Sequence, residues 1–242
     1  MMQASTRCGP SRRAVVGAVL AGVAAFASGC THAEVPAAPE RSPQQVLAAA
    51  QQKLDATSGV RIALRTNNLP AGTSGLTEAI GTATNAPAFE GTLKVMFGGS
   101  SVEVPMVAVA GKVRAQLPLT TGWSDIRPSD YGAPDPAAFV SKGAGFSSLL
   151  PTTSQPTRGA TVRGGSDNSE VLTEYTGTVP GSAMKTVIPS ASGDVFSVVY
   201  TVTASDELRT ARFTGVFYPN SAPMTYSVTF DRYGTTKQIT LP

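Results

Sequence analysis

The chain contains very few of the side chains that catalyse reactions or bind metals. Its 242 residues include one histidine, His32, and two cysteines, Cys8 and Cys30, all before the first segment with a structural pattern. The patterned part of the chain therefore has no Ser-His-Asp or Cys-His arrangement and no histidine for a metal site. It also has no Gly-x-Ser-x-Gly elbow, and Gly143-Ala-Gly145 lacks the rest of a phosphate-binding loop. We expect no enzymatic activity, no cofactor and no bound metal.

Long apolar runs are missing as well. The apolar stretch Ala14–Phe26 has thirteen residues, whereas a helix needs about 20 to cross a ~30 Å hydrocarbon core. It follows Arg7, Arg12 and Arg13, and small residues come after it, an order typical of a cleaved secretory signal. We therefore predict a signal peptide over residues 1–29.

Cys30 comes directly after this signal and follows Ala27-Ser28-Gly29. Small residues that end at a cysteine resemble the bacterial lipobox, in which the cysteine receives a diacylglyceryl thioether and becomes the new N-terminus. The resemblance implies that acyl chains such as palmitate on Cys30 anchor the exported protein to the cell membrane. Two alternatives stay open: ordinary cleavage beside an incidental cysteine, and a twin-arginine signal at Ser11-Arg12-Arg13.

The excess of positive charge belongs to the signal peptide. The whole chain has 19 basic and 16 acidic residues, for a formal net charge of +3. The signal contains three of the arginines and no acidic residue, so the mature chain has 16 basic residues against 16 acidic ones. A chain without net charge gives no electrostatic reason to bind nucleic acid, and we predict no such partner.

The mature chain begins with a tether and a helix. Residues 30–42, with the acylated Cys30 at their start, are rich in proline and alanine and lack apolar periodicity, which predicts an extended tether. Ser42 and Pro43 then supply an N-cap and a first-turn proline for a helix that reaches Thr57. We predict one domain over residues 43–242.

From Val60 onward the apolar residues recur with a period of two, which predicts β-strands. In Gly91–Phe97, for example, Leu93, Val95 and Phe97 share one face. Strands are predicted at residues 60–66, 91–97, 102–110, 112–117, 171–179, 195–204, 208–218, 224–230 and 237–241. Short helices are predicted at residues 135–140, 146–150 and 180–188. The fold class is therefore α+β, with a single antiparallel sheet and helices on one face.

Several stretches that follow one another in the chain resemble the mycobacterial LppX/LprG/LprF family of envelope lipoproteins. They are Lys53–Thr66, Gly91–Ser100, Gly122–Asp125, Asp135-Pro136, Gly145–Leu150, Thr176–Lys185 and Tyr233–Thr240. The similarity covers residues 42–242 in the family's order. Two stretches, Tyr131–Pro136 and Asp194–Tyr200, depart from the family's pattern, so the subfamily and its ligand stay open.

The resemblance implies a strongly curved antiparallel half-barrel with helices packed on its concave face, enclosing an apolar cavity. It also implies that the protein binds multi-acylated lipids or glycolipids and carries or presents them between the inner membrane and the outer envelope. Phenylalanines and methionines in the strand and helix patterns suit such a cavity, but equally a filled core. The candidate lining residues are Leu93, Val95, Phe97, Val104, Met106, Phe146, Leu149, Leu150, Met184 and Val187, and the candidate headgroup contacts are Lys94, Arg114 and Arg127.

Two other functions remain open from the sequence. One is an adaptor that docks on an envelope transporter or a cell-wall enzyme without carrying cargo, which predicts an exposed apolar patch. The other is an esterase that uses one of the serines, although no partner base is visible for it. A carrier must expose the mouth of its cavity, so we expect a monomer.

Overall fold

The computed structural model of the protein describes residues 40–131, 133–165 and 167–242. The predicted signal peptide, Cys30 and the tether as far as residue 39 lie outside the described residues. Glu40–Pro242 forms one compact unit. Within the described ranges no helix combines the length and the apolar character needed to span a bilayer.

The described residues form eleven strands and two α-helices, with three 3-10 helices between them. The helices are α1 (Pro43–Ala56), α2 (Gly181–Val187), η1 (Pro128–Tyr131), η2 (Pro136–Ala138) and η3 (Phe146–Leu149). The strands are β1 (Gly59–Arg65), β2 (Gly75–Thr84), β3 (Ala88–Phe97), β4 (Ser100–Val109), β5 (Lys112–Ala115), β6 (Ser124–Ile126), β7 (Ser154–Gly164), β8 (Glu170–Pro180), β9 (Val195–Thr203), β10 (Leu208–Gly215) and β11 (Met224–Asp231).

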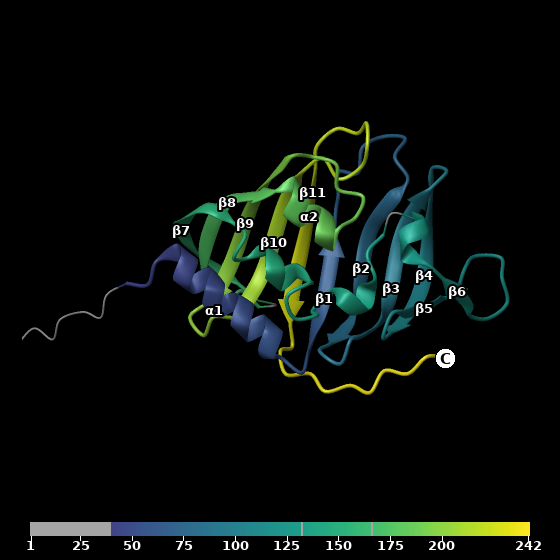
Figure 1. Cartoon of the computed structure of the whole chain (residues 1–242), viewed down its shortest axis with the longest axis horizontal. Coiled ribbons are helices and arrows are strands. Elements are labelled where there is room, and N and C mark those ends of the chain that lie inside the picture. Colours follow the sequence, from purple (N-terminus) through teal and green to yellow (C-terminus); the bar gives the residue numbers. More distant parts are fainter. Residues whose placement is uncertain (1–39, 132, 166) are drawn as a thin grey trace, which may run out of the picture. The chain divides into compact units, whose positions relative to one another are not determined.

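All the strands belong to one antiparallel sheet in the order β6-β5-β4-β3-β2-β1-β11-β10-β9-β8-β7 (Figure 1). The sheet is two meanders joined side by side, because β1 pairs with β11 in the register Ile62↔Phe230. Among the described strands, β6 and β7 end the order without pairing with each other, so the sheet is not closed. The predicted α+β class with a single antiparallel sheet is confirmed.

Helix α1 begins where its sequence predicts. The Ser42 hydroxyl accepts a hydrogen bond from the Gln45 backbone N–H at 3.3 Å, and the Gln45 side chain accepts one from the Ser42 N–H at 2.8 Å. This reciprocal pair is a capping box, which satisfies two of the N–H groups that a helix start leaves free. The buried residues Val46, Leu47 and Leu54 make one face, which packs against β7, β10 and η3.

The helices cover one face of the sheet (Figure 1). Helix α2 packs on β8 and β9, whereas η2 packs on β2, β3 and β4. The strand side chains that point toward them are mostly apolar and buried, as Ile62, Phe213 and Phe230 are. The core therefore lies between the helices and this face, which we call the inner face.

The opposite, outer face is polar. Lys94 lies 3.2 Å from a Glu78 carboxylate oxygen and 3.4 Å from one of Glu103, while Arg65 contacts Glu78 at 2.6 Å. The hydrogen bond from Arg65 holds the pKa of Glu78 below its usual value. Threonine pairs across neighbouring strands, such as Thr214 with Thr225 at 2.9 Å, continue this polar surface.

The prediction of a strand at residues 237–241 is wrong. This segment lies against the outer face instead, where Ile239 is buried beside Ala88 and Val107. The Lys237 ammonium group lies 3.0 Å from a Glu90 carboxylate oxygen and fixes the same segment. Its apolar alternation therefore serves packing and not strand pairing.

Five further elements differ from the prediction. Strands β2, β6 and β7 were not predicted, because their sequences contain few large apolar residues. The helices predicted at residues 135–140 and 146–150 are single 3-10 turns, η2 and η3, since Gly143 and Gly145 interrupt the segment between them. The helix predicted at residues 180–188 is confirmed as α2.

Candidate functional site

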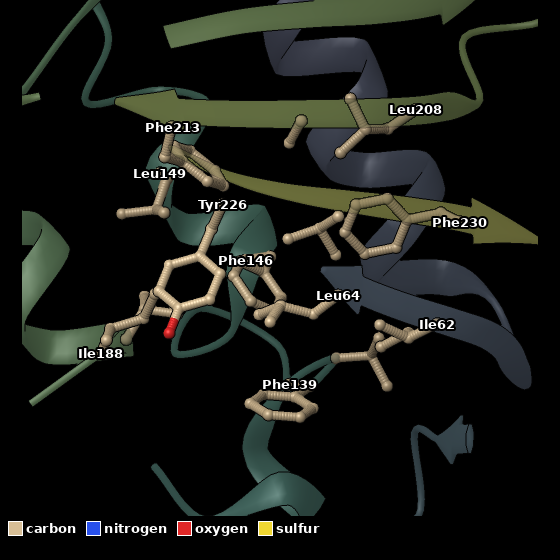
Figure 2. Packing of buried hydrophobic residues seen from close by; sticks show 14 of the residues in the cluster. Ile62, Leu64, Phe139, Phe146, Leu149, Ile188, Leu208, Phe213, Tyr226 and Phe230 are labelled. Atoms are coloured by element: carbon tan, nitrogen blue, oxygen red, sulfur yellow. The ribbon is translucent and has the colours of Figure 1, made fainter. Parts of the chain in front are cut away.

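A cavity of about 250 Å³ lies between strands β1–β3 and the covering segment, residues 133–139, that contains η2. We call it the apolar hollow. Figure 2 shows Leu64 and Tyr226, from adjacent strands, near Phe146 and Ile188 of the covering elements. Its walls are Leu64, Ser74, Gly75, Leu76, Ala79, Leu93, Val95, Phe97, Tyr131, Ala133, Pro134, Pro136, Phe139, Phe146, Ile188, Ser190, Tyr218 and Tyr226. Among these described residues none is charged, which suits an apolar ligand.

Ala79 on β2 borders the apolar hollow, where a larger inward side chain would fill part of the space. Gly81 and Gly91 share the same inner face, but they make room for the Phe89 ring and not for the hollow. Gly81 pairs directly with Gly91, and the Phe89 ring lies over both glycines where a Cβ would collide with it. The sheet therefore leaves space that the covering segment fills only in part.

Two tyrosines satisfy the backbone polar groups of Leu76 in the wall of the hollow. The Leu76 N–H donates to the Tyr218 hydroxyl at 3.1 Å, Tyr218 and Tyr226 share a hydrogen bond of 2.9 Å, and Tyr226 donates to the Leu76 carbonyl at 2.6 Å. This ring of bonds satisfies the backbone of Leu76 next to an irregularity in the β2–β3 pairing. Burial raises the pKa of Tyr226 well above that of a free tyrosine, so its hydroxyl stays protonated and the wall stays uncharged.

Four of the ten predicted lining residues lie on the walls of the apolar hollow: Leu93, Val95, Phe97 and Phe146. The other six lie elsewhere. Val104, Met106, Leu149, Leu150 and Met184 are buried in the packed core, and Val187 borders a second pocket. The period-two pattern of a strand shows which residues share a face of the sheet. Whether such a residue borders an empty space depends on the side chains that the covering helices place opposite it.

The candidate headgroup contacts are not at the apolar hollow. Lys94 and Arg114 belong to the outer face, where Lys94 pairs with Glu78 and Arg114 lies 3.1 Å from Asp125. Arg114 also donates a hydrogen bond to the Pro242 carbonyl. Arg127 borders the second pocket and not the hollow. The structure therefore does not support Lys94 and Arg114 as headgroup contacts.

The sequence missed most of the wall contributed by loops and covering elements. Phe139 follows η2 and packs against Phe146 with the ring centres 5.4 Å apart and the ring planes tilted by 36°, and Tyr218 lies after β10. Tyr226 lies in the alternating pattern of β11, which places it on the same face as Phe230. The alternating pattern of β11 could therefore have identified Tyr226, whereas Phe139 and Tyr218 lie outside strands and belong to no such pattern.

The second pocket lies on the other side of the covering segment. Its volume is about 430 Å³, and it shares Ala133, Pro134 and Phe139 with the apolar hollow. The hollow by itself is smaller than the roughly 300–1,000 Å³ of pockets that enclose drug-sized ligands. The covering segment therefore divides two spaces that would be continuous without it.

The described residues give no indication of a metal centre. Within residues 40–131, 133–165 and 167–242 no three histidine, cysteine, aspartate or glutamate side chains are grouped closely enough to hold an ion.

Three comparisons relate the chain to known proteins. The model of the LppX_LprAFG lipoprotein family matches residues 42–241. The crystal structure of LprF from Mycobacterium bovis is similar, with a TM-score of 0.67 and 16% identity over 84% of this chain and 98% of that one. The crystal structure of the lipoprotein LppX from Mycobacterium tuberculosis is also similar, with a TM-score of 0.57 and 18% identity over 82% of this chain and 100% of that one. No curated protein matches the chain.

Proposed function

We propose that this chain, which belongs to the LppX_LprAFG lipoprotein family, binds the acyl chains of a lipid or glycolipid in its apolar hollow. It then carries or presents that lipid between the inner membrane and the outer envelope. The observation that supports this function is the uncharged wall of the hollow, with its polar backbone groups satisfied by Tyr218 and Tyr226. A site of this kind holds hydrocarbon and offers no group for catalysis or metal binding, so we propose a binding protein and not an enzyme.

The energetic need for such a protein is large. Transfer of an acyl chain into water costs roughly 0.8 kcal/mol for each methylene group, so a chain of about 16 carbons costs more than 10 kcal/mol. A protein site that replaces the bilayer interior with an apolar wall removes most of this cost. The proposed transfer is then close to neutral in free energy, which lets the protein release its ligand as well as bind it.

A multi-acylated ligand needs more space than the apolar hollow offers. We propose that the covering segment, residues 133–139, moves away from the sheet and joins the hollow to the second pocket, because Ala133, Pro134 and Phe139 border both. The sheet would then form a half-barrel around one large cavity. In that state Val104, Met106, Leu149, Leu150, Met184 and Val187 would complete the predicted lining.

The cellular setting follows from the segment before the domain. We propose that residues 1–29 are removed, that Cys30 carries the acyl chains, and that residues 30–42 tether a monomeric domain on the exported side of the cell membrane. Two or more acyl chains on one cysteine hold a protein stably on a bilayer, whereas one gives marginal binding.

A paired substitution tests lipid binding. Val95→Trp adds a large side chain at the wall of the hollow, and Val199→Trp adds the same bulk to the outer side of β9. Both variants and the parent, produced with the signal intact in a mycobacterial host, are examined for co-purified lipid by native mass spectrometry. We expect lipid on the parent and on Val199→Trp, and a loss of most of it on Val95→Trp. Equal lipid on the two variants, or a parent without lipid, contradicts the proposed function.

The alternative is an adaptor that docks on an envelope transporter or cell-wall enzyme. Phe97 and Tyr131 favour it, because their side chains are 72% and 70% exposed and both border the hollow. An adaptor does not need lipid, so Val95→Trp would leave its partner binding unchanged. Crosslinking in cells that captures the same protein with the parent and with Val95→Trp would support the adaptor.

A further inference from the structure

The apolar hollow opens at one edge of the sheet. Five segments contribute to its walls there: residues 66–75, 97–101, 128–131, 188–193 and 216–223. Four of them, all except residues 128–131, adjoin strand ends or turns on the same edge, and Figure 1 shows the connections after β1 and β10 there. The fifth segment, η1, follows the end of β6 and reaches the hollow through Tyr131. We call these segments the mouth rim.

The mouth rim is almost free of charge. Four of its segments, residues 66–75, 97–101, 188–193 and 216–223, contain no acidic or basic residue, and Asp130 is the one charged residue of the fifth. They consist mainly of glycine, proline, serine, asparagine and apolar residues. Surface loops normally carry charge that keeps them in water, so this composition over several loops favours contact with a less polar medium.

Two large side chains project from the mouth rim. Phe97 ends β3 beside a turn with positive φ at Gly98 and Gly99, and Tyr131 ends η1. Their exposed fractions are 72% and 70%, although both also border the apolar hollow. Exposed aromatic rings gain free energy at the boundary between lipid headgroups and acyl chains. The mouth of the hollow thus has two side chains suited to that boundary.

The opposite edge of the sheet is charged. Asp206 and Glu207 lie in the β9–β10 turn, and Asp231 and Arg232 lie at the end of β11. Asp206 binds Arg41 at 2.8 Å, so the described chain begins at this charged edge and not at the mouth rim.

The length of the segment between Cys30 and the domain allows the mouth rim to reach the membrane. Residues 31–40 span at most about 35 Å when extended. A strand of ten residues, such as β3, spans about 33 Å from edge to edge. An anchor at Cys30 can therefore attach to the charged edge while the opposite edge faces the same bilayer.

We propose that the mouth rim docks on the bilayer that anchors the protein, with Phe97 and Tyr131 inserted at its headgroup boundary. This inference rests on the proposed lipid-binding function and adds the surface through which lipid enters. The hollow then opens directly against the bilayer, and an acyl chain passes between them without crossing water. Docking needs no anionic lipid, because the mouth rim offers no basic cluster among its described residues.

Two tryptophan reporters test the orientation. The native tryptophan is first removed by Trp123→Phe. Ala222→Trp then places a reporter on an exposed mouth-rim residue that does not border the hollow, and Ala204→Trp places the matched reporter at the charged edge. Each acylated full-length mature protein is reconstituted into phosphatidylcholine vesicles with brominated acyl chains, which quench tryptophan that reaches them. We expect strong quenching for Ala222→Trp and weak quenching for Ala204→Trp.

A second pair of variants identifies the contact. Phe97→Asp, added to Ala222→Trp, is expected to lower the fraction of docked protein about tenfold, because it removes one inserted ring and adds a charge. Leu119→Asp is the control, since this leucine is fully exposed on the β5–β6 connection away from the hollow. Its quenching is expected to match that of the parent reporter.

The outcomes separate the two proposals, because native mass spectrometry measures lipid in the hollow independently. Equal quenching of the two reporters, or stronger quenching at Ala204→Trp, overturns docking even if lipid co-purifies with the protein. Quenching that survives Phe97→Asp also overturns the proposed contact. Strong quenching at Ala222→Trp in a protein that never carries lipid supports docking and refutes the proposed carrier function.

Discussion

The two halves of the sheet have the same alternating pattern but different interiors. In β8–β11 the inner face carries large rings, and Phe196, Tyr200 and Phe213 are each buried beneath α1, α2 or η3. In β2 and β3 the inner face carries Ala79 and Leu93 at the hollow, and its one large buried ring, Phe89, lies over Gly81 and Gly91. The first half is filled by its own strands, whereas the second leaves the apolar hollow.

The helices that cover the two halves of the sheet also differ. Helix α1 has 14 residues, a capping box and a continuous buried face. The 3-10 helices η1 and η2 have four and three residues, and short 3-10 turns have few internal hydrogen bonds. Pro136, Ala137 and Phe139 are buried, but a segment with few internal hydrogen bonds opens at a lower free energy than a capped helix. The filled half therefore provides most of the packed core, whereas the hollow half leaves unfilled space.

The largest expected effect is on the filled half. Phe213→Ala removes a fully buried ring that lies 6.2 Å from the ring of Phe146 and 6.1 Å from that of Tyr200. We expect the free energy of unfolding to fall by about 3–5 kcal/mol. Leu93→Ala, at the wall of the hollow, is expected to cost less than half as much. Urea denaturation of both variants measures the difference. Equal losses of unfolding free energy would show that the two halves contribute equally to stability.

A smaller effect is expected on the outer face of the hollow half. Removal of residues 237–242 uncovers Val107 and Ala88 and deletes Ile239, which is buried against them. We expect the free energy of unfolding to fall by about 1–2 kcal/mol, the value for one large apolar side chain. A single Ile239→Ala change should reproduce about half of the loss. Urea denaturation with no change for either protein would show that this segment does not stabilise the hollow half.

Stability is expected to depend on alkaline pH, because two tyrosines are buried: Tyr200 on β9, and Tyr226 on β11 at the border of the hollow. Burial raises the pKa of Tyr200 and of Tyr226 above the usual value of about 10. Both hydroxyls therefore stay protonated in the folded protein while the unfolded chain ionises. The stability is fully present below pH ~10 and is lost as the pH rises beyond it.

The check is a series of urea midpoints between about pH 8 and pH 11, compared with those of Tyr200→Phe. The variant is expected to lose less stability over this range than the parent. Tyr200→Phe also removes the 3.1 Å hydrogen bond to Thr153 and so changes stability at every pH. The alkaline loss of each protein is therefore measured relative to its own stability at pH ~8. Parallel curves for the two proteins would rule out Tyr200 as a source of the alkaline loss.

The smallest effect concerns η3, which covers the filled half. The hydroxyl of Ser147 is buried and has no hydrogen-bond partner among the described residues. Ser147→Ala is expected to leave stability unchanged or to raise it by up to about 1 kcal/mol. Ser148→Ala, which removes a 2.7 Å bond to the Gly145 carbonyl, is expected to lower it by about 1 kcal/mol. Thermal denaturation of both variants distinguishes these signs.

The sequence predicted the elements that contain large apolar side chains at a regular spacing. Helix α1 follows from Ser42, Pro43 and its apolar face, and β3, β4 and β9 follow from alternation. The sequence of β2, GLTEAIGTAT, is rich in glycine and small residues and gives no such signal. Its place is fixed by pairing with β1 and β3 on either side, which a local pattern does not reveal.

The apolar hollow was predictable only in part for a related reason. The alternation correctly grouped Leu93, Val95 and Phe97 on one face. Met184 was predicted to line the cavity from a covering helix, but it lies on α2 and is fully buried in the packed core. Whether an inward side chain borders a space or fills one depends on the layer opposite, and this is set by contacts between residues far apart in the sequence.

The open sheet leaves two lateral edges, and each has features that prevent a second chain from adding to it. Strand β6 has three residues, too few to support an extended pairing. Strand β7 is long but contains Pro156, Arg158 and Arg163, and its pairing with β8 is irregular at two places. Proline, charge and irregular backbone at an edge strand oppose aggregation through the sheet. Molecules at high local concentration can therefore meet edge to edge without joining into fibrils.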